Sequence, residues 1–278
     1  MGSMSKEPYP SKTYQCPSNP FRGPDGVLVM AHRGGGGLMP ENTLASFGHA
    51  IEMGADILET DIHTTRDGEL VLIHDPYVDR VSDGDGLVSD FTLADLKKLD
   101  AGYLWSPDDG KSYPFRGKGL TIPTLAETLE AFPHIWVNID IKSEDPAAAL
   151  QLTQFIRAHG VAERMMVGSF WPPVLKAFRV ACPEVQTSAH PREIMRFLVL
   201  HKLFLTALFR TPANVLQIPD VHKGFTVVTP RLIRAAHRRG LAVHVWTIDE
   251  PETMRNLIEW GVDAIITDYP DRLLALRE

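Results

Sequence analysis

The stretch NTLASFGHAIEMGADILETDI, residues 42–62, contains one complete helix-and-strand unit of this chain. Its first part has apolar residues at helical spacing, between a capping Asn42 or Thr43 and Gly54, a typical helix stop. Its second part, residues 55–62, alternates between apolar and polar residues as a β-strand does. The stretch therefore predicts a helix that leads directly into a strand.

Strand-like runs of this kind recur along the chain, with segments of helical spacing between them. The predicted strands cover Val27 to Ala31, Ile57 to Ile62, Ile135 to Ile141, Met165 to Gly168, Val185 to Ala189, Val215 to Ile218, Ala242 to Trp246 and Ala264 to Thr267. Eight alternating β and α units predict an α/β fold, the (β/α)8 TIM barrel. After the second strand, residues 76–120 are rich in Gly, Asp and Pro, and we expect an insertion there that covers the barrel mouth.

The composition is that of a soluble globular protein, with 44% hydrophobic and 23% charged residues. Among 278 residues, 28 basic and 35 acidic side chains give a net charge of −7, which argues against nonspecific binding of nucleic acid. Residues 1–26 form a polar extension without the apolar core of a signal peptide, and residues 27–278 form the barrel domain. Cys16 and Cys182 are too few for a disulfide framework. We expect a protein of the cytoplasm or of the membrane periphery.

Two carboxylates and a histidine are expected to meet at the second predicted strand. Glu59 and Asp61 are two residues apart, so they point to the same face and can share one cation. The Asp67-Gly68 pair between two apolar runs predicts a hairpin tip. With that tip, the numbers of paired residues sum to 135, which places His74 opposite Asp61 on the same face.

Further polar residues follow the ends of other predicted strands, where the active sites of such barrels lie. They are His32 and Arg33 after the first strand, Asp140 and Lys142 at the third, and Trp246 at the seventh. Glu59, Asp61 and Asp140 offer only oxygen ligands, so we expect a divalent cation, Mg²⁺ or Ca²⁺. Two alternatives stay open: the carboxylates pair with Arg33 or Lys142, or Asp140 accepts hydrogen bonds from nearby backbone.

His32 and His74 are suited to proton transfer, because the unperturbed pKa of imidazole lies near physiological pH. We expect His32 to activate the nucleophile and His74 to protonate the leaving group, and the reverse assignment stays open. Two structural histidines at the edge of the core are the alternative. His190 and His244 also lie near strand ends.

Residues 194–209 form an apolar run that is interrupted and flanked by basic residues. The run is too short and too charged to span a bilayer. Placed after the fifth strand at the barrel mouth, it can enter a lipid interface or bind an acyl chain. The alternative is a barrel helix that packs against the insertion or against a second copy of the chain.

Eight ordered motifs together resemble the glycerophosphodiester phosphodiesterase family, over the chain from about residue 27 to its end. They are His32-Arg33-Gly34, Pro40-Glu41-Asn42-Thr43, Glu59-Thr60-Asp61, Asp67-Gly68, His74-Asp75, Val137-Asn138-Ile139-Asp140-Ile141-Lys142, Val245-Trp246-Thr247 and Ile265-Ile266-Thr267-Asp268. The resemblance implies a distorted barrel with an insertion after the second histidine, a divalent cation, and hydrolysis of glycerophosphodiesters to glycerol phosphate and an alcohol. Asp140 stands where the family usually has Glu, so ligand distance or metal preference can differ. Residues 194–209 loosely resemble the corresponding segment of the family's lysophospholipase D branch.

The sequence thus predicts a metal-dependent phosphoric diester hydrolase that acts on glycerophosphoalcohols or lysoglycerophospholipids. Arg33 and Lys142 are expected to bind the phosphate, and Trp246 either lines the alcohol pocket or packs within the barrel. The nucleophile is water or a neighbouring glycerol hydroxyl, which would form a cyclic phosphate. Two other classes fit the residues: a barrel phosphodiesterase of the phosphoinositide phospholipase C or sphingomyelinase D kind, and a noncatalytic phospholipid-binding barrel.

Overall fold

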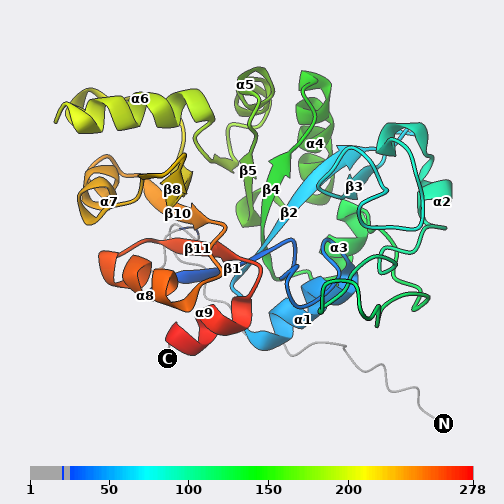
Figure 1. Ribbon diagram of the computed structural model, residues 1–278. Helices are drawn as coiled ribbons and strands as arrows, with labels where there is room; N and C mark the ends of the chain where they lie inside the picture. Colours follow the sequence, from blue (N-terminus) through cyan, green and yellow to red (C-terminus); the bar gives the residue numbers. More distant parts are fainter. Residues whose placement is uncertain (1–20, 22–25, 278) are drawn as a thin grey trace, which may run out of the picture.

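A ring of eight parallel strands forms the centre of the computed structural model, which describes Phe21 and residues 26–277 (Figure 1). The strands are β1 (Leu28–His32), β2 (Ile57–Thr64), β4 (Trp136–Ile141), β5 (Met165–Gly168), β6 (Gln186–Thr187), β7 (Val215–Pro219), β10 (Ala242–Trp246) and β11 (Ala264–Thr267). Hydrogen-bonded neighbours follow the order β6-β5-β4-β2-β1-β11-β10-β7. The N–H of Ala189 donates to the carbonyl of Val215 over 2.8 Å, which joins β6 to β7 and nearly closes the ring. The predicted TIM barrel and its eight strands are confirmed.

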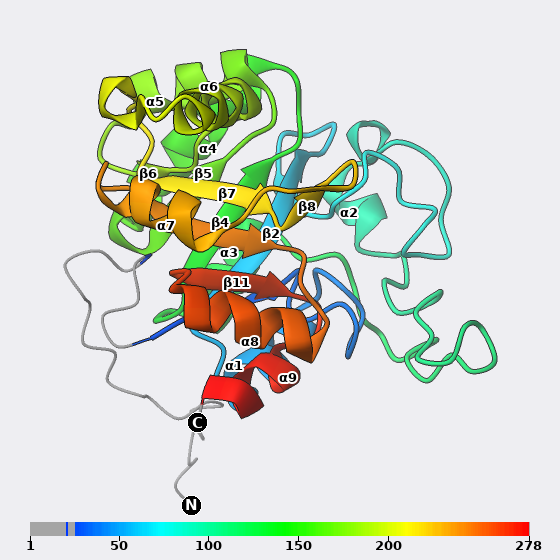
Figure 2. The ribbon, with the colours of Figure 1, turned by 60° about the vertical axis from the view of Figure 1, so that its left-hand side comes forward.

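Helices surround the ring on the outside (Figures 1 and 2). They are α1 (Leu44–Met53), α3 (Leu125–Ala131), α4 (Pro146–His159), α5 (Pro172–Ala181), α6 (Pro191–Lys202), α7 (Pro230–His237), α8 (Pro251–Trp260) and α9 (Pro270–Arg277), with short 3-10 helices η2 (Ala162–Arg164) and η3 (Thr206–Leu208). The helix predicted within residues 42–53 is confirmed as α1. The Thr43 hydroxyl caps it by accepting from the N–H of Ser46, and Gly54 ends it at φ 109°, a left-handed conformation that favours glycine.

Alternate residues of the strands face two different cores. In β1, Val29 and Ala31 point outward to the helices, whereas Met30 points into the barrel. Inside the barrel, a smaller apolar cluster closes the amino-terminal ends of the strands. In that cluster the rings of Phe21 and Trp136 meet edge to face, with centroids 5.4 Å apart. This floor leaves the opposite, carboxyl-terminal mouth for polar groups.

The hairpin after β2 exists, but its predicted register is wrong. The strand β3 (Leu70–Leu72) pairs antiparallel with β2, with Ile62 opposite Leu72, so paired numbers sum to 134 and not to 135. The N–H of Thr65 donates to the carbonyl of Glu69, which leaves a three-residue tip with Gly68 at φ 89°. The left-handed glycine at the third tip position accounts for the extra residue.

The segment predicted as an insertion, residues 76–120, contains the 3-10 helix η1 (Val88–Asp90), the short helix α2 (Leu93–Leu96) and otherwise irregular chain. Buried Val78, Val88 and Leu96 pack with Val71 of β3 in a separate apolar cluster. Figure 2 shows this segment, which includes α2, beside the barrel near β2. None of its residues lines the main pocket of the described chain, so the prediction that it covers the pocket is wrong.

The predicted polar extension over residues 1–26 and Cys16 lie outside the described residues, apart from Phe21 and Gly26. Cys182 is buried and forms no disulfide within the part of the chain described. Over Phe21 and residues 26–277, no helix combines the length and the apolar character needed to cross a membrane.

Candidate active site

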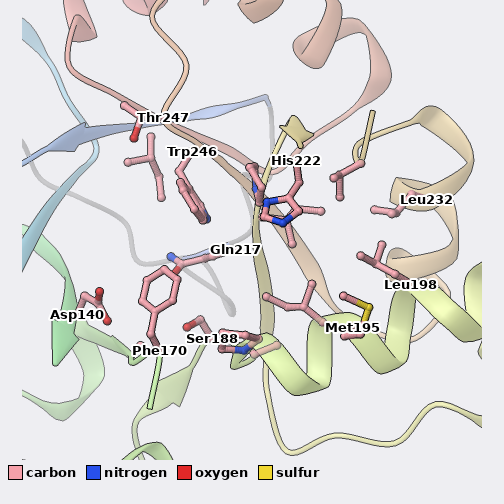
Figure 3. A pocket seen from close by; sticks show the side chains of 18 of the residues that line it. Asp140, Phe170, Ser188, Met195, Leu198, Gln217, His222, Leu232, Trp246 and Thr247 are labelled. Atoms are coloured by element: carbon pink, nitrogen blue, oxygen red, sulfur yellow. The ribbon is translucent and has the colours of Figure 1, made fainter. Parts of the chain in front are cut away.

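The carboxyl-terminal ends of the barrel strands surround a cavity of about 1040 Å³. All eight residues predicted for the site line this cavity: His32, Arg33, Glu59, Asp61, His74, Asp140, Lys142 and Trp246. The structure therefore brings together residues that are up to 214 positions apart in the sequence. Figure 3 shows Asp140, Phe170, Gln217 and Trp246 around the polar part of this pocket.

Two neighbouring strands place the three carboxylates. Glu59 and Asp61 are two residues apart on β2, and Asp61 lies directly opposite Asp140 in the parallel pairing of β2 with β4. Asp61 is 1% exposed and Glu59 6%, so both lie well below the protein surface. The same-face prediction for these residues depends only on strand periodicity and holds despite the wrong hairpin register.

Two cationic side chains lie against the carboxylates. The Lys142 ammonium is 2.9 Å from Asp61 Oδ1 and 2.7 Å from Asp140 Oδ2. The Arg33 Nε atom is 3.4 Å from Asp61 Oδ2, and the backbone N–H of Arg33 donates to Glu59 over 3.2 Å. The ion pairs considered as an alternative to metal binding are thus present.

These cations do not compensate the whole carboxylate cluster. Burial and the nearby charge of Asp61 raise the pKa of Glu59 to about 7. Burial also raises the pKa of Asp140, although Lys142 opposes that shift. For Asp61, burial is outweighed by Lys142 and Arg33, and its pKa is lowered. A pKa raised in this way shows that the charged form lacks compensation, which a bound cation would supply.

The first imidazole is held by a carboxylate from β11's end. His32 Nδ1 donates to Asp268 Oδ1 over 2.8 Å, and its Nε2 lies 3.9 Å from Glu59 Oε2. Burial alone would lower the pKa of His32, but the hydrogen bond to Asp268 and the charge of Glu59 outweigh burial and raise it. The ring is therefore fixed in orientation, with Nε2 facing the carboxylate cluster.

The second imidazole has a similar partner but a different environment. His74 Nδ1 donates to Asp75 Oδ1 over 2.6 Å, and the His74 carbonyl accepts from His63 Nε2 over 3.1 Å. Burial lowers the pKa of His74, and the positive charges of Lys142 and Arg33 add to that shift against the opposing charge of Asp61. The N–H of Ile73 still donates to the carbonyl of Asp61 over 3.1 Å, and His74 lines the cavity from the chain that leaves the sheet after Ile73.

Sequence reasoning missed the groups that orient the two imidazoles. Asp75 directly follows His74 in the sequence, and this was the available signal for it. Asp268 is 236 positions from His32, so only the folded chain shows that contact. Arg80 gave no sequence signal. Its guanidinium donates to Asp75 and, over 2.8 and 2.7 Å, to both oxygens of Glu41. Arg80 thereby connects the segment after β3 to the loop before α1.

Two further histidines near strand ends lie away from this site. His190 caps α6, with Nδ1 accepting from the N–H of Arg192 over 3.1 Å. His244 is buried in the barrel floor, where Nε2 donates to the carbonyl of Phe21 over 2.7 Å. Neither one lines the cavity formed by the described residues.

The cavity continues from the polar site into an apolar part. Its walls there are the α6 side chains Ile194, Met195, Leu198 and Val199, together with Leu232 of α7. The small hairpin of β8 (Val221–His222) and β9 (Phe225–Thr226) bounds the same space. Figure 3 shows Met195, Leu198 and Leu232 facing His222 across it.

At the polar end, two carboxylate-oriented imidazoles can deliver and remove protons around an anion that Arg33 and Lys142 attract. The buried carboxylates of Glu59 and Asp61, together with the partly buried carboxylate of Asp140, suit a hard divalent cation. Proton transfer, a divalent cation and cationic side chains that bind phosphate are all means by which enzymes cleave phosphoric diesters. The fold and the site together define a barrel hydrolase of phosphodiesters.

Comparisons with known proteins support this class of enzyme. The model of the glycerophosphoryl diester phosphodiesterase family matches residues 32–272. A glycerophosphodiester phosphodiesterase from Caldanaerobacter subterraneus is 35% identical, over 90% of this chain and 97% of its own length. The human lysophospholipase D GDPD1 is 26% identical, over 88% of this chain and 84% of its own length. The structure of an Oleispira antarctica phosphodiesterase, solved with the product sn-glycerol-3-phosphate, superposes with a TM-score of 0.70 at 27% identity. The superposition covers 90% of this chain and 96% of the other. The chain belongs to the glycerophosphodiester phosphodiesterase family and is a hydrolase.

Proposed function

We propose that this enzyme hydrolyses glycerophosphodiesters whose glycerol carries an acyl chain, the lysoglycerophospholipids, as well as smaller glycerophosphoalcohols. The observation that supports this is the continuity of one cavity from the charged strand ends to the apolar face of α6. Its volume of about 1040 Å³ is at the upper limit of ordinary ligand pockets, which is more than a glycerol phosphate alone fills. The products are a glycerol phosphate or a lysophosphatidate and an alcohol.

In this proposal Arg33 and Lys142 bind the phosphate. Lys142 supplies a point charge beside Asp61 and Asp140, and Arg33 supplies a planar guanidinium. Trp246 meets Phe170 edge to face, with ring centroids 6.2 Å apart, between the polar and apolar parts of the cavity. These two rings are placed to flank the glycerol and the first carbons of a chain.

Glu59, Asp61 and Asp140 would hold a divalent cation, Mg²⁺ or Ca²⁺. Within the described residues, no three His, Cys, Asp or Glu side chains already stand in metal-binding geometry. The donor set still fits a cation, because burial raises the pKa of both Glu59 and Asp140 although Lys142 is nearby. When bound, the cation would neutralise charge that develops on the phosphate oxygens.

The two histidines would exchange the protons. A raised pKa makes the neutral His32 ring the stronger base, and a lowered pKa makes the protonated His74 ring the stronger acid. We therefore assign His32 to the activation of the nucleophile and His74 to the protonation of the leaving alcohol. Detection of a cyclic phosphate in a rapid quench would identify the glycerol hydroxyl as the nucleophile, and its absence would identify water.

The proposal that the apolar part of the cavity binds an acyl chain is tested by filling that part with a larger side chain. Leu198→Trp adds a large ring to the α6 wall, away from the imidazoles and carboxylates. We expect kcat/KM for lysophosphatidylcholine to fall about tenfold or more, because overpacking excludes the chain, and kcat/KM for glycerophosphocholine to stay unchanged. The matched control is Val180→Trp on α5, a site that is 77% exposed and outside the cavity. Equal losses on both substrates would contradict the assignment.

A relative named lysophospholipase D also supports contact with a lipid interface through residues 194–209. In the structure these residues form most of α6, the turn after it and η3. α6 packs inward through the fully buried Phe197, while Met195 and Val199 stay exposed. Membrane contact through these exposed side chains is therefore part of the proposal.

A further inference from the structure

The open apolar end of the cavity is flanked by exposed apolar side chains on two segments. After α6 these are Leu203, Phe204, Leu205 and Leu208, and on the small hairpin they are Val221 and Phe225. Phe204 is 78% exposed and Phe225 77%, values that are unusual for residues of this size. The cavity lining includes His201 and Lys202 next to the first group and Phe225 from the second, so both segments border the same opening. We call these six residues the apolar rim.

The conformation that exposes the rim is held by specific contacts. Phe204 has φ 62°, a conformation that a bulky residue adopts only when its surroundings fix it. The Arg231 guanidinium lies 3.8 Å from the Phe204 ring centroid and donates to the carbonyl of His201 over 2.9 Å. On the hairpin, Lys223 and Gly224 both have positive φ, as in a type I′ turn, which places Phe225 directly after the tip.

The chain segment that carries the rim has a charge opposite to that of the rest of the chain. Residues 191–239 contain nine Lys and Arg but only two Asp and Glu, in a protein of net charge −7. Glu193 already pairs with Arg179, and Asp220 accepts from the N–H of Val221. Among the described residues, none of the nine basic side chains forms a salt bridge. Positive charge is thus available next to exposed apolar groups.

We propose that the apolar rim docks this protein on an anionic lipid bilayer, with the apolar end of the cavity open to the membrane. Apolar side chains that enter the acyl boundary and cations that meet acidic headgroups are the two components of interfacial binding. The inference rests on the proposed function, because a lysolipid would then pass from the bilayer into the cavity without crossing water. A second copy of the chain that covered the apolar rim with its own rim would bring the same cations face to face, which is unfavourable.

Flotation with lipid vesicles tests the docking separately from catalysis. We expect the protein to float with phosphatidylcholine vesicles that contain phosphatidylglycerol, to float much less with pure phosphatidylcholine, and to detach as salt increases. Phe204→Ser/Leu208→Ser should lower the partition coefficient about tenfold or more, since two large apolar groups leave the interface. The control Leu150→Ser/Val180→Ser removes exposed apolar groups elsewhere and should float like the wild type.

The contribution of basic side chains to membrane binding is tested by reversing their charge. Lys202→Glu/Lys223→Glu should lower binding to the anionic vesicles by at least about fivefold for each charge removed. The matched control is Lys111→Glu/Lys118→Glu, two exposed lysines of the segment beside the barrel. If both variants lost the same amount of vesicle binding, the effect would come from the net charge of the protein alone. That result would overturn the role of the rim.

Further outcomes separate docking from the proposed function. His74→Ala should float like the wild type, because flotation needs no turnover. Phe204→Ser/Leu208→Ser should hydrolyse glycerophosphocholine normally, since neither residue lines the cavity, but should hydrolyse vesicle-borne lysophosphatidylcholine more slowly. A wild-type protein that never floats with the vesicles would overturn the docking.

The docking would also be overturned if the wild-type protein were a dimer in solution and the rim variant were a monomer. A protein that floats but leaves lysophosphatidylcholine intact would overturn the substrate assignment and support the docking.

Discussion

The polar and apolar ends of the cavity are built from different parts of the barrel. The polar end comes from strand ends and the residues directly after them, whereas the apolar end comes from α6, α7 and the β8–β9 hairpin. Strand ends are fixed by the nearly closed sheet, and the helices and loops around them can vary without disturbing it. In the proposed function, this arrangement separates the chemistry from the choice of substrate. A change at the polar end should affect every diester, and a change at the apolar end only those with a chain.

Removal of the second imidazole should have the largest effect. His74→Ala should lower kcat about 10²- to 10⁴-fold for both glycerophosphocholine and lysophosphatidylcholine, because the proposed proton donor to the leaving alcohol is then missing. Steady-state kinetics on the two substrates measures the effect. The control is His222→Ala at the apolar end, which should leave glycerophosphocholine turnover nearly unchanged. A His74→Ala loss confined to one substrate would break the separation of the two ends.

Removal of the cation should also affect both substrates. We expect EDTA to lower turnover about 10²- to 10³-fold, and Mg²⁺ or Ca²⁺ to restore it, because the cluster of Glu59, Asp61 and Asp140 is then uncompensated. Turnover with each added cation checks the expectation. Full activity after exhaustive chelation would show that Lys142 and Arg33 suffice without a metal.

The carboxylate behind His32 should have a smaller effect with a characteristic pH dependence. Asp268→Asn should lower kcat about 10- to 100-fold, as for other groups that orient a functional histidine. The hydrogen bond to Asp268 raises the pKa of His32 against burial, so its loss lowers that pKa. If neutral His32 is the base, the acidic limb of the kcat/KM profile moves to lower pH. Movement of the alkaline limb instead would make His32 the acid.

The polar end could be predicted from the sequence because it depends on local geometry. Residues two apart on a strand share a face, and parallel strands bring their carboxyl ends to one edge, so Glu59, Asp61 and Asp140 converge whatever the loops do. Prediction failed where it depended on one residue of register. The left-handed Gly68 lengthened the hairpin tip, and His74 reached the site only because the chain leaves the sheet before it.

The apolar end could not be predicted in the same way. The run over residues 194–209 was visible, but which of its side chains face the cavity depends on packing against α7 and the hairpin. The hairpin itself is two residues per strand, too short for a periodic signal. Arg80 likewise acts through contacts with Glu41 and Asp75 that only the folded chain creates.

A change in the barrel floor should have the smallest effect on turnover and should leave the ratio between the two substrates unchanged. His244 is fully buried, its Nδ1 has no hydrogen-bond partner among the described residues, and burial lowers its pKa to about 4. Above pH 6.5 the ring is neutral in both the folded and the unfolded chain. Between pH 6.5 and about 4 only the unfolded chain binds the proton, so the free energy of unfolding falls as pH falls.

This group should contribute a loss of about 3 kcal/mol over that interval. His244→Gln keeps a donor for the Phe21 carbonyl but does not titrate, so its free energy of unfolding should fall less than that of the wild type. Denaturant unfolding at pH 7 and pH 4.5 measures the difference. Parallel pH curves for the two proteins would mean that the folded state accommodates the charge. A changed substrate ratio in the variant would mean that the floor couples to one end of the cavity more than to the other.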